Sequence, residues 1–297
     1  HTSKAGVTGR LAARLAGVPA VVHGVHILPF DNVPAGERWL YLAIERALAP
    51  ATHAFVNVSE GMQTLGLEHR VGRPERHFVV PSGMDVAAFR QAQPFTPAEL
   101  SERLGGRRPG PLLVFTAALE PRKRQFEFLD CMAAVRRRVP GALLVLLGEG
   151  HDESRIRARI AELELNDAVH LAGYSTEVPR WIASSRACVF ASEREGLPRA
   201  VIQYVLGGRP VVSTRLPGIE AVVEHDDNGF LVDIDRLDAM VEPLVTVLTE
   251  PETERRLATA SRDRNLSAWD QAHMAARLAE IYSNVRASQR RLSGAAA

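Results

Sequence analysis

The sequence predicts an α/β protein of two domains with parallel sheets, the second a complete doubly wound sheet and the first incomplete. Short apolar runs of strand length alternate with amphipathic helical stretches along all 297 residues, as in parallel sheets covered by helices on both faces. Hydrophobic residues form 46% and charged residues 24% of the chain, which is the composition of an ordinary soluble globular protein. The length suffices for two domains of ordinary size.

The strand candidates are short apolar runs bounded by turn-forming residues. In chain order they cover residues 20–25, 54–58, 78–80, 112–117, 143–147, 169–172, 187–191, 211–213 and 230–232. Stretches with apolar residues at helical spacing fill the intervals. They cover residues 6–16, 34–48, 59–65, 125–138, 153–163, 178–184, 199–206, 219–224, 235–248, 252–265 and 268–287.

Residues 86–110 are predicted to link two domains, because prolines and a Gly-Gly-Arg-Arg run interrupt the pattern there. The second domain, 111–265, has enough strand candidates for a complete doubly wound sheet. The first, 1–85, cannot form an equal partner at roughly 30 residues per βαβ unit, so we expect an N-terminal piece to be missing. A last helix, 266–287, is expected to return to the first domain, and a tail, 288–297, to be disordered.

Charge and cysteine content bear on the class of protein. Lys and Arg total 36 against 35 for Asp and Glu, so the overall charge does not favour nucleic acid as a partner. Cys131 and Cys188 lie in apolar surroundings without metal-ligand spacing, which indicates buried thiols of a reducing, cytoplasmic compartment. No apolar run approaches the ~20 residues of a membrane span. Lys4, Arg10 and Arg14 beside apolar residues of helix 6–16 suggest peripheral contact with a membrane.

The most informative segment is 191–213, which predicts a strand end, a polar loop, a buried helix, a glycine stop and another strand. The loop carries Glu193, Arg194 and Glu195 directly before a helix N-terminus, where parallel α/β proteins bind anions and sugar phosphates. Gln203 is the one polar residue in the apolar helical run. Its amide needs a partner, either in the protein or on a ligand.

Several motifs follow one another in a specific order over most of the chain. They are His1-Thr2-Ser3-Lys4-Ala5-Gly6, Val22-His23-Gly24-Val25-His26, Val58-Ser59-Glu60, Val80-Pro81-Ser82-Gly83-Met84-Asp85, Leu119-Glu120-Pro121-Arg122-Lys123, Leu147-Gly148-Glu149-Gly150, the Glu195 loop and Asn228-Gly229-Phe230-Leu231-Val232. In this order and spacing they resemble the glycosyltransferase family 4 enzymes, which have the GT-B fold of two Rossmann-like domains.

The resemblance implies a function as well as a fold. Family members transfer a sugar from a nucleotide-sugar donor with retention of anomeric configuration, and no metal or other cofactor is expected. The implied partners are the nucleotide sugar and a saccharide or lipid-linked acceptor. The implied location is the cytoplasm, with peripheral contact at the inner membrane face as an option.

The resemblance also assigns roles to single positions, with two departures from the family pattern. Glu195 matches the first of the family's two glutamates separated by seven residues, and Lys123 matches its diphosphate-binding lysine. Gln203 stands where the second, ribose-binding glutamate is expected, so donor binding should be weaker because an amide lacks charge assistance. Ala118 stands where the family usually has an arginine.

Positively charged side chains near these positions are further candidates for the phosphates. Arg122 or Arg124 could take over the role of the arginine that the family usually has at the position of Ala118. Arg199 shares a helix face with Gln203 because the two are four residues apart. We expect Arg199 to contact phosphate or sugar.

Backbone groups and one aromatic ring complete the predicted donor site. Gly196 and Leu197 precede a helix start, where N–H groups are available to sugar hydroxyls or phosphate. Gly148 and Gly150 form a turn between a strand and a helix, as phosphate-binding loops do, although this short pattern is a weak signal by itself. Tyr174 follows the glycine of a turn that contacts the base in the family, and could border the nucleobase.

From the first domain, His26 is the candidate to face the donor sugar. It follows a strand, and imidazole can form a hydrogen bond with a sugar hydroxyl in either protonation state. The neighbouring His23 is more readily explained as a structural residue.

Two other functions stay open at this point. Ala118, Gln203 and the short first domain favour a non-catalytic homologue that binds nucleotide or a partner glycosyltransferase. A nucleotide-sugar epimerase of the same fold is the second alternative, although the Glu195 loop and the Lys123 motif argue against it. Donor turnover distinguishes the first alternative from an active transferase, and product analysis distinguishes the second.

Overall fold

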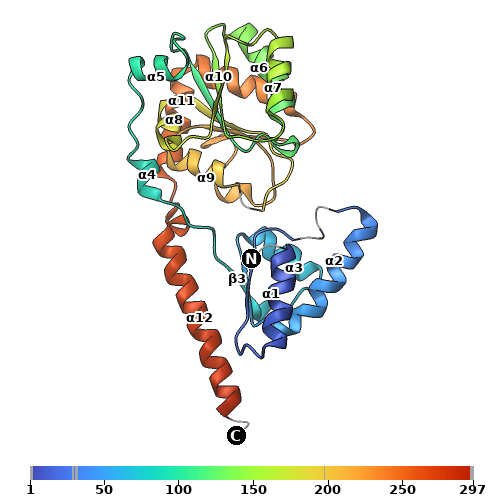
Figure 1. Cartoon of the computed structure of the whole chain (residues 1–297). Helices are drawn as coiled ribbons and strands as arrows, with labels where there is room; N and C mark the ends of the chain where they lie inside the picture. The colour runs from blue at the N-terminus through green and yellow to red at the C-terminus, as the bar shows by residue number, and fades with distance from the viewer. Residues whose placement is uncertain (1–2, 29, 31–32, 197, 295–297) are drawn as a thin grey trace. The chain divides into compact units, whose positions relative to one another are not determined.

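The computed structural model describes residues 3–28, 30, 33–196 and 198–294. The chain forms two compact units, shown in Figure 1. Unit 1 comprises residues 1–84 and 267–297, and unit 2 comprises residues 85–266. The chain therefore passes between the units twice, once after Met84 and once after Leu266.

Unit 1 contains a parallel three-stranded sheet in the order β1-β2-β3. The strands are β1 (Val22–Val25), β2 (Ala54–Asn57) and β3 (His77–Val79). The helices are α1 (Ser3–Leu15), α2 (Ala35–Leu48), α3 (Glu60–Glu68) and α12 (Gln271–Gly294), with 3-10 turns at Ala49–Ala51, Pro74–Arg76 and Ser267–Trp269.

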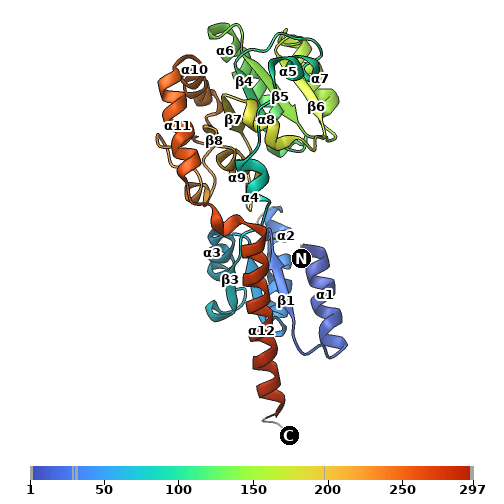
Figure 2. The ribbon, with the colours of Figure 1, turned by 90° about the vertical axis from the view of Figure 1, so that its left-hand side faces the viewer.

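Both faces of this sheet are covered, since successive side chains of a strand point to opposite sides. One face packs against α12, which Figure 2 shows lying along the strands, in a cluster of Ala54, Val56, Val80, Ile281 and Val285. On the other face the Phe55 ring stacks on His77, with ring centres 4.6 Å apart. Helix α12 thus completes the core of a unit whose other elements come from the start of the chain.

Helix α12 continues through residues 288–294, where the sequence led us to expect disorder. The stretch has no Pro, and no Gly before Gly294, so nothing in it stops a helix. The hydroxyl of Ser288 donates to the Asn284 carbonyl at 2.9 Å within the helix. Residues 295–297 of the predicted tail lie outside the described residues.

Arg10, which the sequence suggested for a membrane-facing surface, is instead buried. Its Nη2 atom donates to both carboxylate oxygens of Glu45 in α2 at 2.7 Å, and both side chains are only 2% exposed. The ion pair joins α1 to α2, so the guanidinium is not available to a lipid surface; only Arg14 of the two arginines is exposed. Within the described ranges, every helix is too short or too polar to serve as a bilayer span.

His23 in β1 should make unit 1 less stable in acid. Burial, and then the charge of Arg10, lower the pKa of His23 from 6.5 to about 3. Below pH 6.5 the unfolded chain is protonated at this histidine, whereas the folded chain stays neutral there until about pH 3. The contribution of His23 to the free energy of unfolding is therefore complete above pH 6.5 and is lost progressively between pH 6.5 and 3. We expect a loss of roughly 2–4 kcal/mol from this group.

The measurement is the thermal unfolding midpoint of the wild-type chain and of His23→Gln between pH 7 and pH 4. The substitution removes the titrating group, so the midpoint of the variant should depend less steeply on pH. Burial also lowers the pKa of His77, so some dependence should remain. Identical slopes for the two proteins would refute the assignment to His23.

Unit 2 contains a parallel sheet of six strands in the order β6-β5-β4-β7-β8-β9. The strands are β4 (Leu112–Thr116), β5 (Leu143–Leu147), β6 (Val169–Gly173), β7 (Ala187–Phe190), β8 (Val211–Thr214) and β9 (Gly229–Val232). The helices are α4 (Val86–Arg90), α5 (Pro97–Arg103), α6 (Gln125–Arg138), α7 (Glu153–Glu162), α8 (Val178–Ser184), α9 (Arg199–Leu206), α10 (Val241–Thr249) and α11 (Pro251–Asp263).

The strand order reverses between β4 and β7. From β4 the chain adds β5 and β6 on one side, and then crosses to add β7, β8 and β9 on the other. Loops that leave the carboxyl ends of two such strands diverge and open a crevice, which is where doubly wound sheets bind their ligands. The loops after β4 and β7 are therefore the place to look for a site.

Residues 86–110, expected as a linker, contain α4 and α5 and belong to unit 2. Helix α5 begins with a capping box in which the Thr96 hydroxyl accepts from the Glu99 N–H while the Glu99 carboxylate accepts from the Thr96 N–H. Two ion pairs, Arg103 to Glu177 and Arg180 to Glu99, fasten α5 to the segment around α8. Pro97 starts a helix here instead of excluding one.

Both cysteines of unit 2 are buried, as predicted. Burial raises the pKa of Cys131 to about 11 and that of Cys188 to about 12. Both groups therefore remain protonated thiols at neutral pH, and they act as small apolar side chains of the core.

Candidate functional site

Charged side chains gather at the carboxyl ends of β4 and β7, where the strand order reverses. The loop after β4 leads into a 3-10 turn, Pro121–Lys123, that precedes α6. The loop after β7 carries Ser192 to Gly196 and leads into α9. The two loops are joined directly, because the Glu193 N–H donates to the Arg122 carbonyl at 3.0 Å.

Lys123 is a largely buried cation in this group. Its side chain is 11% exposed, its Nζ donates to Glu195 Oε1, and the same nitrogen lies 5.6 Å from the centre of the Phe190 ring. A buried ammonium is retained only with a partner of opposite charge. The structure therefore brings together two of the predicted residues, Lys123 and Glu195.

The Glu195 carboxylate accepts three donors on one oxygen. Besides Lys123, Arg122 Nη1 lies 3.0 Å and Ser192 Oγ 2.8 Å from Oε1. Among the described residues no donor contacts Oε2. One oxygen thus fixes the carboxylate in place while the other keeps its capacity to accept a hydrogen bond.

Arg122 and Arg124, both candidates to replace the arginine missing at Ala118, have different surroundings. Arg122 is 43% exposed and pairs with Glu120 and Glu195, so it borders the same carboxylate as Lys123. Arg124 has a φ of 59° before α6, and its Nη1 donates to the Ile234 carbonyl at 2.6 Å. The structure therefore brings Arg122, and not Arg124, to Glu195.

Ser192 belongs to this group, although sequence reasoning did not select it. It is fully buried, its hydroxyl donates to Glu195, and its carbonyl accepts from the Thr214 hydroxyl at 2.7 Å. It thereby fixes the Glu195 loop to the end of β8. Its only signal in the sequence is a polar residue directly after an apolar strand.

Helix α9 (Figure 1) places Arg199 and Gln203 on its less buried face. The Gln203 amide is half-buried and has no hydrogen-bond partner among the described residues. On the opposite face, buried Tyr204 accepts from the Thr116 N–H at 2.6 Å, which holds α9 against the end of β4. Burial raises the pKa of Tyr204, so the phenol stays neutral.

The remaining predicted donor-site residues also follow the carboxyl ends of strands in the unit 2 sheet. Gly196 is half-buried directly after Glu195, and Leu197 lies outside the described residues. Tyr174 follows β6 with 75% of its surface exposed, so its ring is not part of the core. Its N–H donates to the Glu149 carboxylate at 3.3 Å, which ties the turn after β6 to the turn after β5.

Gly148 and Gly150 allow the loop after β5 to pass very close to the loop after β4. Gly148 has a φ of +138°, and a Cβ there would lie 2.1 Å from the Ala117 carbonyl oxygen. A Cβ on Gly150 would lie 2.2 Å from the carbonyl oxygen of Leu119. The close approach of backbones explains both glycines, and a contact with phosphate stays a prediction.

His26 belongs to unit 1, where it lies exposed directly after β1. That is the carboxyl end of the unit 1 sheet. His23, by contrast, is buried inside the strand, next to Gly6 of α1. His26 is thus exposed and His23 buried, and the role of His26 toward the donor sugar stays a prediction.

Comparison with known proteins identifies the family of the chain. The family model of glycosyl transferases group 1 matches residues 98–264. A galactosyltransferase of Escherichia coli, UDP-Gal:alpha-D-GlcNAc-diphosphoundecaprenol alpha-1,3-galactosyltransferase, is 26% identical over 252 residues. The aligned region covers 83% of this chain and 65% of that protein. Alpha-maltose-1-phosphate synthase of Mycolicibacterium smegmatis is 27% identical over 311 residues, covering 97% of this chain and 78% of that protein.

Solved structures show the fold. The crystal structure of Anabaena Alr3699/HepE in complex with UDP superimposes with a TM-score of 0.81 at 21% identity, covering 95% of this chain and 77% of that one. The same protein in complex with UDP-glucose gives a TM-score of 0.80. Units 1 and 2 thus correspond to the two Rossmann-like domains of the GT-B fold. The glycosyl transferases group 1 model matches more than half of the chain's length, and the chain therefore belongs to the glycosyl transferases group 1 family.

Proposed function

We propose that this chain is a glycosyltransferase that moves a sugar from a nucleotide-sugar donor to a saccharide or lipid-linked acceptor, with retention of anomeric configuration. The observation that carries the proposal is the group of Lys123, Arg122 and Glu195 at the point where the strand order of unit 2 reverses. Two cations and a carboxylate at such a crevice suit a ligand that carries both phosphate and hydroxyl groups.

The leaving nucleoside diphosphate gains negative charge as the bond to the sugar stretches. Lys123 and Arg122 are fixed by Glu195 before the donor arrives, so little reorganisation is needed when that charge develops. They supply positive charge for the leaving group, and the proposal assigns no metal cofactor to this step. The Oε2 atom of Glu195 would accept from a hydroxyl of the donor sugar.

The acceptor is proposed to be a saccharide or a lipid-linked saccharide. The E. coli relative is named for an alpha-D-GlcNAc-diphosphoundecaprenol substrate, which supports a lipid-linked saccharide as the acceptor. Such an acceptor would place the reaction at the cytoplasmic membrane face. Retention rests on the resemblance of the motifs to glycosyltransferase family 4, and we propose His26 as the residue of unit 1 that faces the donor sugar.

Gln203 is proposed to bind the ribose, because its amide has no partner among the described residues and shares a helix face with Arg199. Gln203→Glu should therefore tighten nucleotide-sugar binding by about threefold to tenfold, since a carboxylate accepts two hydroxyl hydrogen bonds more strongly than an amide. The measurement is calorimetric titration of UDP and UDP-glucose into both proteins. A folded variant with weaker binding would refute the ribose assignment.

The direct test of function is a turnover assay across common nucleotide sugars with saccharide and lipid-linked acceptors. Release of nucleoside diphosphate with a new glycosidic bond of unchanged anomeric configuration would support the proposal. Ala118 and Gln203 favour a non-catalytic nucleotide-binding protein as the second candidate. Tight nucleotide binding without any turnover would favour that candidate, and an altered free nucleotide sugar would favour an epimerase.

A further inference from the structure

Four arginines line one hollow of about 260 Å³ in unit 1. They are Arg46, Arg70, Arg73 and Arg76. Arg46 comes from the last turn of α2, and the other three come from the segment between α3 and β3. The hollow therefore lies at the amino ends of β2 and β3, the edge of the sheet opposite to the strand end that His26 follows.

The positive charge of this arginine hollow is poorly neutralised by the protein. Of the four, only Arg73 approaches a carboxylate of the described residues, that of Glu75 at 4.0 Å with both side chains well exposed. Arg46, Arg70 and Arg76 have no carboxylate within 4.0 Å among the described residues. By contrast, arginines elsewhere in the chain, such as Arg10 and Arg103, have close carboxylate partners.

Two of the four guanidinium groups are held in place by backbone carbonyls. Arg46 Nε donates to the His69 carbonyl at 2.9 Å. Arg76 Nη1 donates to the carbonyls of Pro50 and Thr52 at 3.2 Å and 3.0 Å. The Nη groups of Arg46, and the Nε and Nη2 of Arg76, have no acceptor within the described part of the chain. These N–H groups are thus held in position and can donate hydrogen bonds to a ligand.

Arg70 occupies a backbone position that normally favours glycine. It directly follows the C-cap residue of α3, with a φ of 55°. The Val71 N–H returns to the Gly66 carbonyl and the Arg70 N–H to the Leu67 carbonyl, both at 2.9 Å. Glycine or asparagine is usual at such a helix end, because other side chains are strained there. No described group accepts from the Arg70 side chain, so internal contacts do not account for this arginine.

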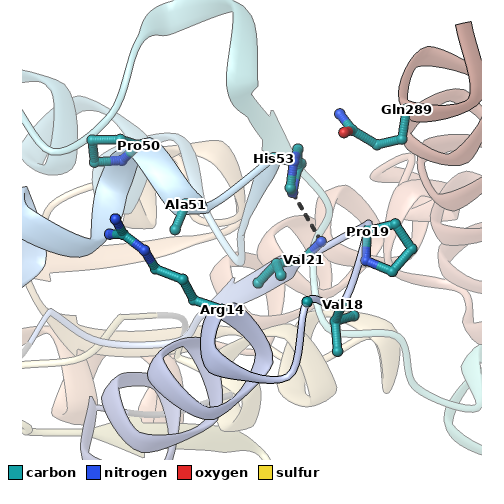
Figure 3. Close-up of a pocket in the computed structure, with 9 residues that line it drawn as sticks. Arg14, Val18, Pro19, Val21, Pro50, Ala51, His53 and Gln289 are labelled. Carbon is teal, nitrogen blue, oxygen red and sulfur yellow. Dashed lines mark hydrogen bonds between the residues drawn. The ribbon is translucent and has the colours of Figure 1, made fainter. Parts of the chain in front are cut away.

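A second hollow of about 430 Å³, shown in Figure 3, adjoins the first and shares Pro50 with it. Its lining includes Arg14 and no carboxylate. In Figure 3 the His53 ring points its Nδ1 at the Val21 N–H, from which it accepts at 3.0 Å. The positive region thus extends from the arginine hollow toward the amino end of β1.

We propose that the arginine hollow is a binding site for a phosphate-bearing anion, separate from the site at Lys123. Guanidinium groups match phosphate oxygens with paired hydrogen bonds, and the volume is sufficient for a pyrophosphate or a phosphate monoester. The phosphate can belong to a free metabolite or to a lipid headgroup. Both sources present the same chemistry to the four arginines, and the experiment below distinguishes them.

The test uses Arg70→Gly, a substitution that should preserve the fold. Glycine is favoured at this φ, so the unfolding temperature of the variant should be unchanged or higher. Binding of inorganic pyrophosphate to the full chain, measured by calorimetry, should weaken about tenfold, as expected for loss of a charged hydrogen bond. Arg137→Gln in α6 is the matched control, since it removes one exposed positive charge elsewhere.

The pyrophosphate titrations of Arg70→Gly and Arg137→Gln are repeated in a Lys123→Ala background. Pyrophosphate bound at the proposed donor site then does not contribute to the result. A loss of pyrophosphate binding specific to Arg70→Gly in that background supports a free-phosphate site. Binding of the same variants to phosphatidylglycerol and phosphatidylcholine vesicles is also measured. If Arg70→Gly, unlike Arg137→Gln, lowers binding to phosphatidylglycerol vesicles and leaves pyrophosphate binding unaffected, the phosphate belongs to a lipid headgroup. Equal effects of Arg70→Gly and Arg137→Gln, or no effect of either, would overturn the proposal. The proposed transferase function would be untouched by that result.

Discussion

Replacing Lys123 with alanine is expected to lower the rate of sugar transfer by roughly 10²–10³-fold, the range for removing one preorganised donor from a site of developing charge. The Lys123 side chain is 11% exposed and its ammonium is already fixed by Glu195, so its charge acts with little screening by water. The measurement is kcat and KM with the nucleotide sugar that the turnover assay identifies.

Arg194→Ala is the matched control for Lys123→Ala. It removes a positive charge from the same pair of loops, but the Arg194 side chain is exposed, and we expect less than a threefold change. Comparable losses in both variants would mean that only the overall charge of the loops matters. A Lys123→Ala protein that is folded and fully active would remove the lysine from the mechanism.

Replacing Glu195 with glutamine should separate catalysis from nucleotide binding. We expect the rate of sugar transfer to decrease by about 10²-fold. An amide oxygen accepts a hydrogen bond from the proposed sugar hydroxyl less strongly than a carboxylate does, and the amide no longer orients Lys123 by charge. Binding of UDP should be retained or tighten by about threefold to tenfold, since the substitution removes a negative charge beside Lys123 and Arg122.

The comparison requires a control carboxylate and two separate readouts. Glu193→Gln serves as the control, because Glu193 is 47% exposed and lies 4.0 Å from Arg124; its rate should change little. UDP affinity and kcat are then measured on each variant. Parallel losses of affinity and rate in Glu195→Gln would show that the carboxylate holds the loops in shape and has no role toward the sugar.

The alternation of strand and helix predicted most of unit 2 because each element carries its own periodicity. Glu195 could be selected because its loop lies between a recognisable strand and a helix, and Lys123 because the motif around it resembles that of the glycosyltransferase family 4 enzymes. Their contact was not predictable, since it depends on β4 and β7 being neighbours in the sheet. Ser192 was missed for a different reason, because a single serine after a strand has no distinguishing spacing.

The predicted linker at 86–110 shows a different kind of error. Thr96-Pro97-Ala98-Glu99 is a capping-box pattern with proline at the first turn, so a signal for α5 was present but outweighed by the prolines and glycines around it. The pairing of Arg10 with Glu45 joins residues 35 positions apart. No local pattern could indicate that pairing, and the arginine of an amphipathic helix was therefore expected at the surface.

The most direct test of the account is a pair of titrations, UDP and uridine, into the wild-type chain and Lys123→Ala. If Lys123 binds the diphosphate, the variant should lose roughly 1.5–3 kcal/mol of UDP binding, the range for a hydrogen bond to a charged group. Its affinity for uridine, which has no phosphate, should be unchanged. Equal losses for UDP and uridine, or no loss for either, would contradict the central claim that the diphosphate of a nucleotide-sugar donor binds at the Lys123 and Glu195 loops.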